Sequence, residues 1–188
     1  MRVGGALVCL FLLGAGPLYA QGTPRAELSG GYSFMHDVDR GEDFSTGWFG
    51  STVGNINSWI GIATEIGGNS RTCRNCQRGP FTSATFRGTA LHLRVFTFMA
   101  GPRVASHAIS AVTPFAQVLV GGSHASGGFQ FDGALTTGFT YQPGAGVDVN
   151  VTPRVGIRLE GDYRVIRTQG HNGKESRVLA VVVVRSGQ

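Results

Sequence analysis

The chain contains the stretch Val155-Gly-Ile-Arg-Leu-Glu-Gly-Asp-Tyr-Arg-Val165, in which two classes of side chain alternate. Apolar residues and one glycine occupy its odd positions, whereas charged residues and one glycine occupy its even positions. Alternate residues of a β-strand point to opposite faces, so the pattern predicts a strand with one apolar and one charged face. In a soluble barrel the apolar face points inward, whereas in a membrane barrel it faces lipid and the charges line the lumen.

The segment just upstream shows the same alternation, and five residues separate it from this strand. Its apolar set is Phe139, Tyr141, Ala145, Val147 and Val149, and its polar or small set is Thr140, Gln142, Gly144, Gly146 and Asp148. Two consecutive two-faced strands indicate an all-β protein. Composition agrees, because 30 of the 188 residues are glycine, and glycine in a helix interior costs about 1 kcal/mol relative to alanine.

Turn signals divide the rest of the chain into further strands, giving eight in total. The predicted strands are Ala26–Met35, Thr46–Asn55, Trp59–Gly68, Thr89–Val104, Ala111–His124, Phe139–Val149, Val155–Val165 and Ser176–Arg185. The connections alternate between long polar loops and short turns. The long loops are His36–Ser45, Asn69–Gly88, Ala125–Gly138 and Thr168–Glu175. In an antiparallel barrel all long loops then fall at one end, which is how outer-membrane barrels are built.

The first twenty residues have the layout of a secretory signal peptide. Arg2 precedes an apolar stretch, and Leu18-Tyr-Ala20 forms a plausible cleavage site before Gln21. The expected domains are therefore a signal peptide at 1–20 and a barrel at 21–188. The whole chain carries 16 basic and 11 acidic residues. Loss of Arg2 leaves 15 − 11 = +4, with no basic stripe of the kind that nucleic acid requires.

Two cysteines remain after cleavage, Cys73 and Cys76, in Cys-Arg-Asn-Cys. A zinc site needs two more ligands at matching spacing, and a thioredoxin-like motif needs a βαβ context. Neither pattern is present in the sequence. We therefore favour a small disulfide-closed loop, as expected in an oxidising compartment.

The orientation of the strands depends on their mid-strand charges. We predict a lumen charge network of Glu27, Glu65, Asp148, Arg158, Glu160, Asp162 and Arg164. The alternative is a soluble periplasmic barrel with these charges outside and a small hydrophobic ligand inside. Aromatic residues recur near strand ends, as expected of girdles at membrane interfaces. These are Tyr32, Phe34, Trp48, Phe49, Trp59, Phe139, Tyr141 and Tyr163.

These features together resemble the small outer-membrane barrels of the OmpA-like or opacity-porin type. The resemblance rests on barrel-position motifs in a fixed order, and it covers nearly all of the mature chain. The motifs lie at Ala26–Phe34, Gly47–Gly50, Asn55–Gly61, Phe98–Arg103, Thr113–Gly122, Gly144–Val149 and Gly156–Tyr163. One departure is the end of the last strand, Val181-Val-Val-Val-Arg-Ser-Gly-Gln188, which lacks the terminal aromatic residue usual in such barrels.

The resemblance implies a monomeric eight-stranded up-and-down barrel in the cell outer membrane, with a structural or surface-interaction role. Its expected partners are membrane lipid and lipopolysaccharide, together with an extracellular ligand of the long loops. We predict no enzyme activity, cofactor or metal site. The alternative is a lipid A-modifying hydrolase using one of the loop histidines, His36, His124 or His171, with a nearby serine and acid.

Overall fold

The computed structural model describes residues 24–39, 41–73, 91–109, 111–127, 136–168 and 171–186. Within these residues all regular structure is β, and no helix is long and apolar enough to cross a membrane. The strands are β1 (Ala26–Asp37), β2 (Glu42–Phe44), β3 (Thr46–Asn55), β4 (Ile60–Cys73), β5 (Leu91–Ala105), β6 (Val112–Gly127), β7 (Thr136–Asn150), β8 (Val155–Thr168) and β9 (His171–Ser186).

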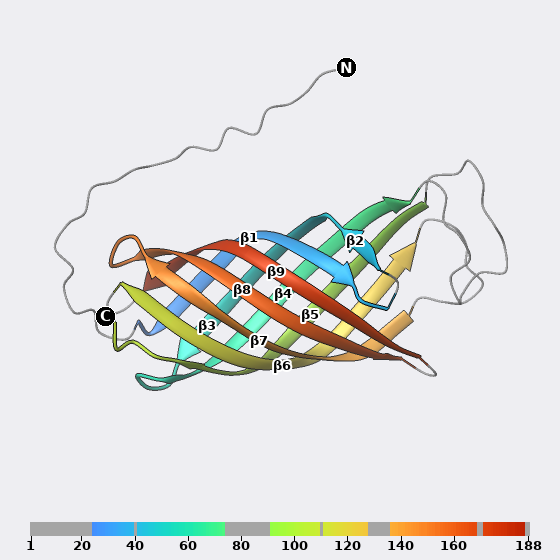
Figure 1. Cartoon of the computed structure of the whole chain (residues 1–188). Helices are drawn as coiled ribbons and strands as arrows, with labels where there is room; N and C mark the ends of the chain where they lie inside the picture. The colour runs from blue at the N-terminus through green and yellow to red at the C-terminus, as the bar shows by residue number, and fades with distance from the viewer. Residues whose placement is uncertain are drawn as a thin grey trace, which may run out of the picture.

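Eight of these strands close into an antiparallel barrel (Figure 1). Each strand from β3 to β9 pairs with the next along the chain, and β1 pairs with both β3 and β9. The closing ladder runs from Ala26–Ser186 to Asp37–Glu175. Closure pairs each of the eight barrel strands on both sides, whereas the short β2 pairs only with β1. The prediction of an all-β, eight-stranded up-and-down barrel is therefore confirmed.

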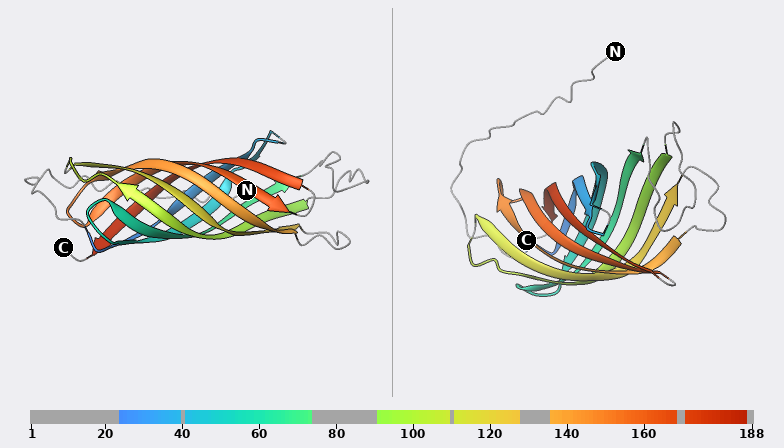
Figure 2. Two further views of the ribbon diagram at one scale, coloured as in Figure 1. Left: turned by 90° about the horizontal axis from the view of Figure 1, so that it is seen from below. Right: turned by 45° about the vertical axis from the view of Figure 1, so that its right-hand side comes forward.

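Three short connections lie together at one end of the barrel (Figure 2). They join β3 to β4, β5 to β6, and β7 to β8, and side chains close two of them. The Asn57 carboxamide oxygen accepts hydrogen bonds from the backbone of Trp59 and Ile60. The Thr152 hydroxyl accepts hydrogen bonds from the backbone of Arg154 and Val155. These local bonds explain why the turns were readable from sequence.

The strands extend farther toward the opposite end than predicted. The segment His36–Ser45 was expected to be a loop, but it contains β2, which pairs with β1 from Met35–Phe44 to Asp37–Glu42. Gly41 lies in the turn at a φ of 64°, a conformation that glycine adopts without strain. Likewise β4 continues from Gly68 to Cys73, and β9 begins at His171 instead of Ser176. Both faces are polar in these extensions, so hydrophobic alternation could not mark them.

The two faces of the barrel carry the side chains that the alternation predicted. On β8 the charged set is buried, whereas Ile157 is 49% exposed and Leu159 52% exposed. Val165 is the member of the apolar set that is buried, at 7% exposure. The girdle prediction was wrong for Phe49, which is 4% exposed and faces the lumen. The charges therefore point inward and most apolar side chains point outward.

Apolar side chains nevertheless fill part of the interior. One cluster contains Val53, Ala63, Met99 and Leu119, and a second contains Phe49, Leu179 and Val181. An eight-stranded barrel is just wide enough for side chains to fill. The lumen is therefore a packed core of apolar patches and ion pairs.

Gly101 allows two of these strands to approach closely. A Cβ atom there would collide with the backbone carbonyl oxygen of Val118 on β6. We expect Gly101→Ala to lower the free energy of unfolding by about 1–3 kcal/mol, the usual cost of overpacking. Gly54→Ala is the matched control, because nothing lies within 4 Å of its added Cβ. Urea-denaturation midpoints test the difference, and equal midpoints would contradict the close approach.

The charged interior as candidate functional site

The seven residues predicted for the lumen network are all buried in the barrel interior. Their exposed fractions range from 0% for Asp148 to 5% for Asp162. They come from β1, β4, β7 and β8, so residues distant in sequence converge on one space. Buried charges are costly unless they are paired. The ion pairs and hydrogen bonds of each charged residue therefore show which groups in the interior are neutralised and which are not.

Asp148 organises the first of two charge clusters, at the end of the barrel with short connections. Arg158 lies directly opposite it across the β7–β8 ladder. The Arg158 guanidinium donates from Nε to Asp148 Oδ1 at 2.7 Å and from Nη2 to Oδ2 at 2.9 Å. Arg103 and Arg185 donate to the same Oδ2 at 3.2 and 3.0 Å. One carboxylate thus contacts three arginines.

Glu27 supplies the second carboxylate of this Asp148 cluster. Its Oε2 atom accepts a hydrogen bond from Arg158 Nη2 at 2.8 Å and lies 3.5 Å from Arg103 Nη1. Phe115 on β6 provides a platform beside the arginines. The guanidinium carbon of Arg103 lies 3.9 Å from the ring centroid, and that of Arg158 lies 4.7 Å from it. An aromatic face attracts cations at this distance, so Phe115 stabilises arginines that outnumber the two acids.

Arg177 organises the second cluster, nearer the opposite end. It lies across the β8–β9 ladder from Asp162 and donates from Nη2 to Asp162 Oδ2 at 2.6 Å. Its Nη1 atom lies 2.7 Å from Glu65 Oε1 on β4. The Arg177 guanidinium carbon also lies 5.3 Å from the ring centroid of Phe49. Arg177 therefore joins three strands through charge and one more through an aromatic contact.

Arg164 completes this Arg177 cluster. Its Nε atom donates to the Gln142 carboxamide oxygen at 2.9 Å. Its Nη1 atom lies 3.4 Å from Glu175 Oε2, and its Nη2 atom lies 3.7 Å from Glu65 Oε1. Gln142 in turn donates to Glu65 Oε2 at 3.3 Å. The cluster thus spans the lumen between β4 and the β7–β9 side.

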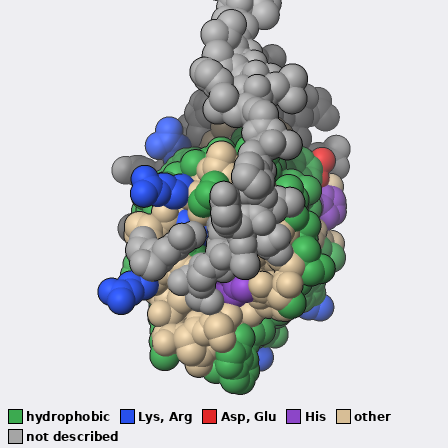
Figure 3. All heavy atoms as spheres, turned by 90° about the vertical axis from the view of Figure 1, so that its left-hand side faces the viewer, with side chains coloured by type: hydrophobic (Ala, Val, Ile, Leu, Met, Phe, Trp, Pro, Cys, Tyr) green, Lys and Arg blue, Asp and Glu red, His purple; other side chains and the backbone are tan. Residues whose placement is uncertain are grey.

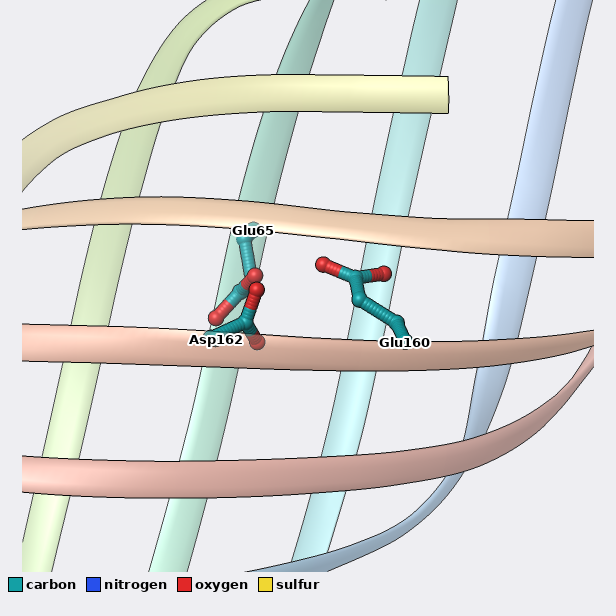
Figure 4. Close-up of side chains that lie close together, drawn as sticks. All are labelled: Glu65, Glu160 and Asp162. Atoms are coloured by element: carbon teal, nitrogen blue, oxygen red, sulfur yellow. The ribbon is translucent and has the colours of Figure 1, made fainter. Parts of the chain in front are cut away.

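Glu160 lies between the two clusters and belongs to neither. Its Oε1 atom accepts a hydrogen bond from Gln117 Nε2 at 2.6 Å. Among the described residues no arginine nitrogen lies within ion-pair distance of its carboxyl group. Figure 4 shows its side chain beside those of Glu65 and Asp162, and one carboxyl oxygen of each lies within 4.8 Å of the others. This is the densest acidic group in the described interior.

Five members of the interior charge set were not predicted. Arg103 was missed because the aromatic-rich β5 gave no clear facing. Arg177 and Arg185 flank an apolar run on β9 in which both faces are apolar. Because the two arginines are an even number of residues apart, eight, they lie on the same face of the strand. This spacing could have predicted that both point inward. Asp37 and Glu175 fall in segments that were predicted as loops. In the structure they occupy opposite positions of the β1–β9 ladder.

The other predicted sites are only partly described. The proposed disulfide lies outside the described residues, because Cys76 and the side chain of Cys73 are not among them. The side chain of His171 is likewise not described. His36 Nδ1 lies 2.6 Å from Asp43 Oδ1, and His124 Nδ1 lies 3.2 Å from Thr137 Oγ1. Within the described part of the chain, no serine is hydrogen-bonded to either histidine.

Comparison with known proteins supports the fold. No protein-family model matches the chain, and no curated protein matches it significantly in sequence. The structure resembles Neisserial surface protein A with a TM-score of 0.62 at 14% identity, over 85% of this chain and 95% of that one. It also resembles Ail, the attachment invasion locus protein of Yersinia pestis, in complex with the heparin analogue sucrose octasulfate. There the TM-score is 0.56 at 16% identity, over 87% of this chain and 99% of Ail.

A third similar structure is the Yersinia pestis outer membrane protein Ail in a phospholipid bilayer nanodisc. Its TM-score is 0.51 at 16% identity, over 86% of this chain and 99% of that one. The chain therefore has the barrel fold found in small outer-membrane proteins, as the sequence motifs indicated. At these identities the likeness concerns the fold alone.

Removing the Asp148 carboxylate tests the energetic weight of its cluster. Asp148→Asn leaves Arg103, Arg158 and Arg185 facing the single carboxylate of Glu27. Breaking a buried ion pair at one partner costs about 3–5 kcal/mol, and we expect a loss of this size in the free energy of unfolding. Asp43→Asn is the control, because its pair with His36 is exposed and worth about 0–1 kcal/mol. The prediction fails if the two variants lose the same stability in urea denaturation.

Proposed function

We propose that the mature chain is an integral protein of the cell outer membrane, with a structural or surface-interaction role and no chemistry of its own. The observation that carries this proposal is the apolar outer face of the barrel. The mature chain would begin at Gln21, after removal of a signal peptide at 1–20. It would act as a monomer, because closure of the sheet leaves no strand edge that needs a partner.

The outer face is apolar along the middle of the described strands. Two polar residues that do lie there, Thr52 and Thr64, pair with each other through hydroxyls 2.7 Å apart. Viewed from the short-connection end, hydrophobic side chains occupy much of the outer margin (Figure 3). Soluble monomers rarely expose an apolar patch of more than about 600 Å². Outward-facing exposed residues include Leu28, Ile62, Ile66, Phe98, Val118, Val120, Ile157, Leu159, Val178, Val182 and Val184.

Aromatic side chains on the outer face support a membrane setting. Trp48 and Phe96 contact each other, with ring centroids 6.2 Å apart. Tyr32, Phe139 and Tyr163 are also exposed, at 41–55%. Tryptophan and tyrosine concentrate where hydrocarbon meets the headgroups. A soluble carrier barrel would place its apolar side chains inside, around a ligand, which is the opposite of this arrangement.

Replacing one outer residue with arginine separates the membrane barrel from a soluble one. Leu159→Arg places a charge mid-strand on the proposed lipid face, where it costs about 2–4 kcal/mol. Val151→Arg is the control, because Val151 is 48% exposed in the β7–β8 turn, which would lie in water. We expect the wild type and V151R to fractionate with the outer membrane and to migrate differently before and after boiling.

For L159R we expect less folded protein and a lower unfolding midpoint in the same gel assay. Release of the wild type as a soluble periplasmic protein, with no heat-dependent shift, would overturn the proposal. Equal behaviour of L159R and V151R would also count against a lipid-facing belt.

The proposed contacts with anionic lipid involve two basic residues of the outer face. Arg167 on β8 and Lys174 on β9 are exposed, lie near the end with long connections and are diagonal neighbours in the ladder. Arg167 lies over the ring of Tyr141, 5.6 Å from its centroid. Cations next to interfacial aromatics are placed to bind headgroup phosphates. Ail has been observed in complex with the heparin analogue sucrose octasulfate, which is consistent with an anionic partner.

The double variant Arg167→Gln, Lys174→Gln tests these contacts. In vesicles that contain lipopolysaccharide, we expect its thermal unfolding midpoint to fall relative to the wild type. In vesicles of neutral phospholipid alone, the two midpoints should coincide. Arg154→Gln, in the turn at the opposite end, should have no effect in either. A similar loss in both vesicle types would indicate a structural role for the two residues.

A further inference from the structure

We propose that Glu160 and Asp162 share one proton, which holds the two carboxyl groups together as a hydrogen-bonded pair inside the barrel. This inference goes beyond the proposed function and depends only on the packing of the interior. In this proposal the proton is bound inside the lumen, between the two carboxyl groups.

Strand geometry brings the two carboxyls together. Glu160 and Asp162 are two residues apart on β8, so their side chains point to the same face. Both are buried, at 3% and 5% exposure. One carboxyl oxygen of Glu160 and one of Asp162 lie within 4.8 Å of each other. Gly144, opposite Asp162 on β7, leaves the space that this arrangement needs, because a Cβ there would collide with Asp162 Oδ1.

Two of their four carboxyl oxygens lack a hydrogen-bond donor. Asp162 Oδ2 accepts from Arg177, and Glu160 Oε1 accepts from Gln117. The remaining atoms, Asp162 Oδ1 and Glu160 Oε2, are buried and have no partner among the described residues. A buried acceptor without a donor costs about 1–3 kcal/mol, and more when it is charged. One proton placed between the two groups satisfies both atoms at once.

The charge balance of the interior points the same way. Its buried charged residues are five arginines and seven acids, so the fully ionised set sums to 5 − 7 = −2. The charged groups that face Glu160 are Asp162 and Arg158 on its own strand, Glu65 on β4 and Arg103 on β5. Arg103 is already paired with Asp148 and Glu27. Arg158 is already bonded to Asp148 and Glu27. Glu160 is therefore the acid whose neutralisation costs the network no ion pair.

A metal ion fits this site less well than a proton. Calcium takes six to eight oxygen ligands, and magnesium requires a nearly octahedral set. Glu65 Oε1 contacts Arg177, and Glu65 Oε2 accepts from Gln142. Only the two unpartnered oxygens of Glu160 and Asp162 remain. Two oxygen atoms next to an arginine are too few for either metal ion, but they are enough to share one proton.

Infrared spectroscopy tests for the proton directly. The purified full chain, folded in lipid vesicles at pH 7, should show the C=O stretching band of a protonated carboxyl group. When the protein is unfolded and refolded in heavy water, this band should shift because deuterium replaces the proton. The band should be absent from Glu160→Gln and retained in Glu27→Gln. A wild-type spectrum with carboxylate bands only would overturn the proposal.

Stability provides the second measurement. Glutamine at 160 reproduces the protonated acid, since its amide can donate to Asp162 Oδ1 while its oxygen accepts from Gln117. We expect E160Q to have an unfolding midpoint equal to or above that of the wild type. Glu27→Gln removes an acid bonded to Arg158 at 2.8 Å and should lower the midpoint.

A cation in place of the proton would give a different result. Adding calcium or sodium would then raise the wild-type midpoint but not that of E160Q, and the infrared band would be missing. A marked loss of stability in E160Q, equal to that in E27Q, would likewise overturn the shared proton. Loss of membrane residence by the wild type would contradict the proposed function while leaving these spectra interpretable in the refolded protein.

Discussion

Pairing of buried charges inside the lumen determines how the strands of the barrel fit together. A buried arginine or carboxylate is tolerated only when its partner and hydrogen bonds are in place. Three partnerships are direct cross-strand pairs, Asp148 with Arg158, Asp162 with Arg177, and Glu175 with Arg164. A slip of one residue in a β-ladder moves every side chain to the other face. The lumen charges therefore act together with the apolar outer face in fixing the register of β7, β8 and β9.

Two lumen aromatics fit the same constraint. Phe49 and Phe115 break the simple division into apolar outside and polar inside, and both lie beside arginines. In the Asp148 cluster three arginines face two acids, so the aromatic ring offsets part of the excess positive charge. In the Arg177 cluster the acids are in excess, and there Phe49 packs with Leu179 and Val181 as well. Each departure from alternation thus has a packing or electrostatic partner.

The barrel architecture could be predicted from the sequence because the two-residue alternation of a strand depends only on residues that are neighbours in the chain. The facing of Ile157, Leu159, Arg158 and Asp148 followed from alternation alone. Turn signals predicted the short β3–β4, β5–β6 and β7–β8 connections, whereas the predicted long loop Thr168–Glu175 is largely strand, because β8 runs to Thr168 and β9 begins at His171. Alternation was insufficient on β9, where Val178 and Val181 face opposite sides yet are chemically alike. It also failed at the strand ends beyond Gly68 and before Ser176, where both faces are polar. The partners of each charge depend on how the barrel closes, which no single strand encodes.

The proposed lipid setting explains why so polar an interior is compatible with a stable fold. In lipid the outward side chains gain little by packing on one another, and closure gives each of the eight barrel strands a paired neighbour on both sides. The interior is then free to be charged, provided that its net charge is low and its polar atoms are bonded. Arginine pairs meet this requirement at both clusters. Between them Gln117 is the one donor to Glu160 among the described residues, and the proton shared with Asp162 meets the same requirement there. A glutamine amide at position 160 would satisfy the same hydrogen bonds without binding or releasing a proton. A carboxyl group there couples the packing of the barrel centre to the binding of one proton.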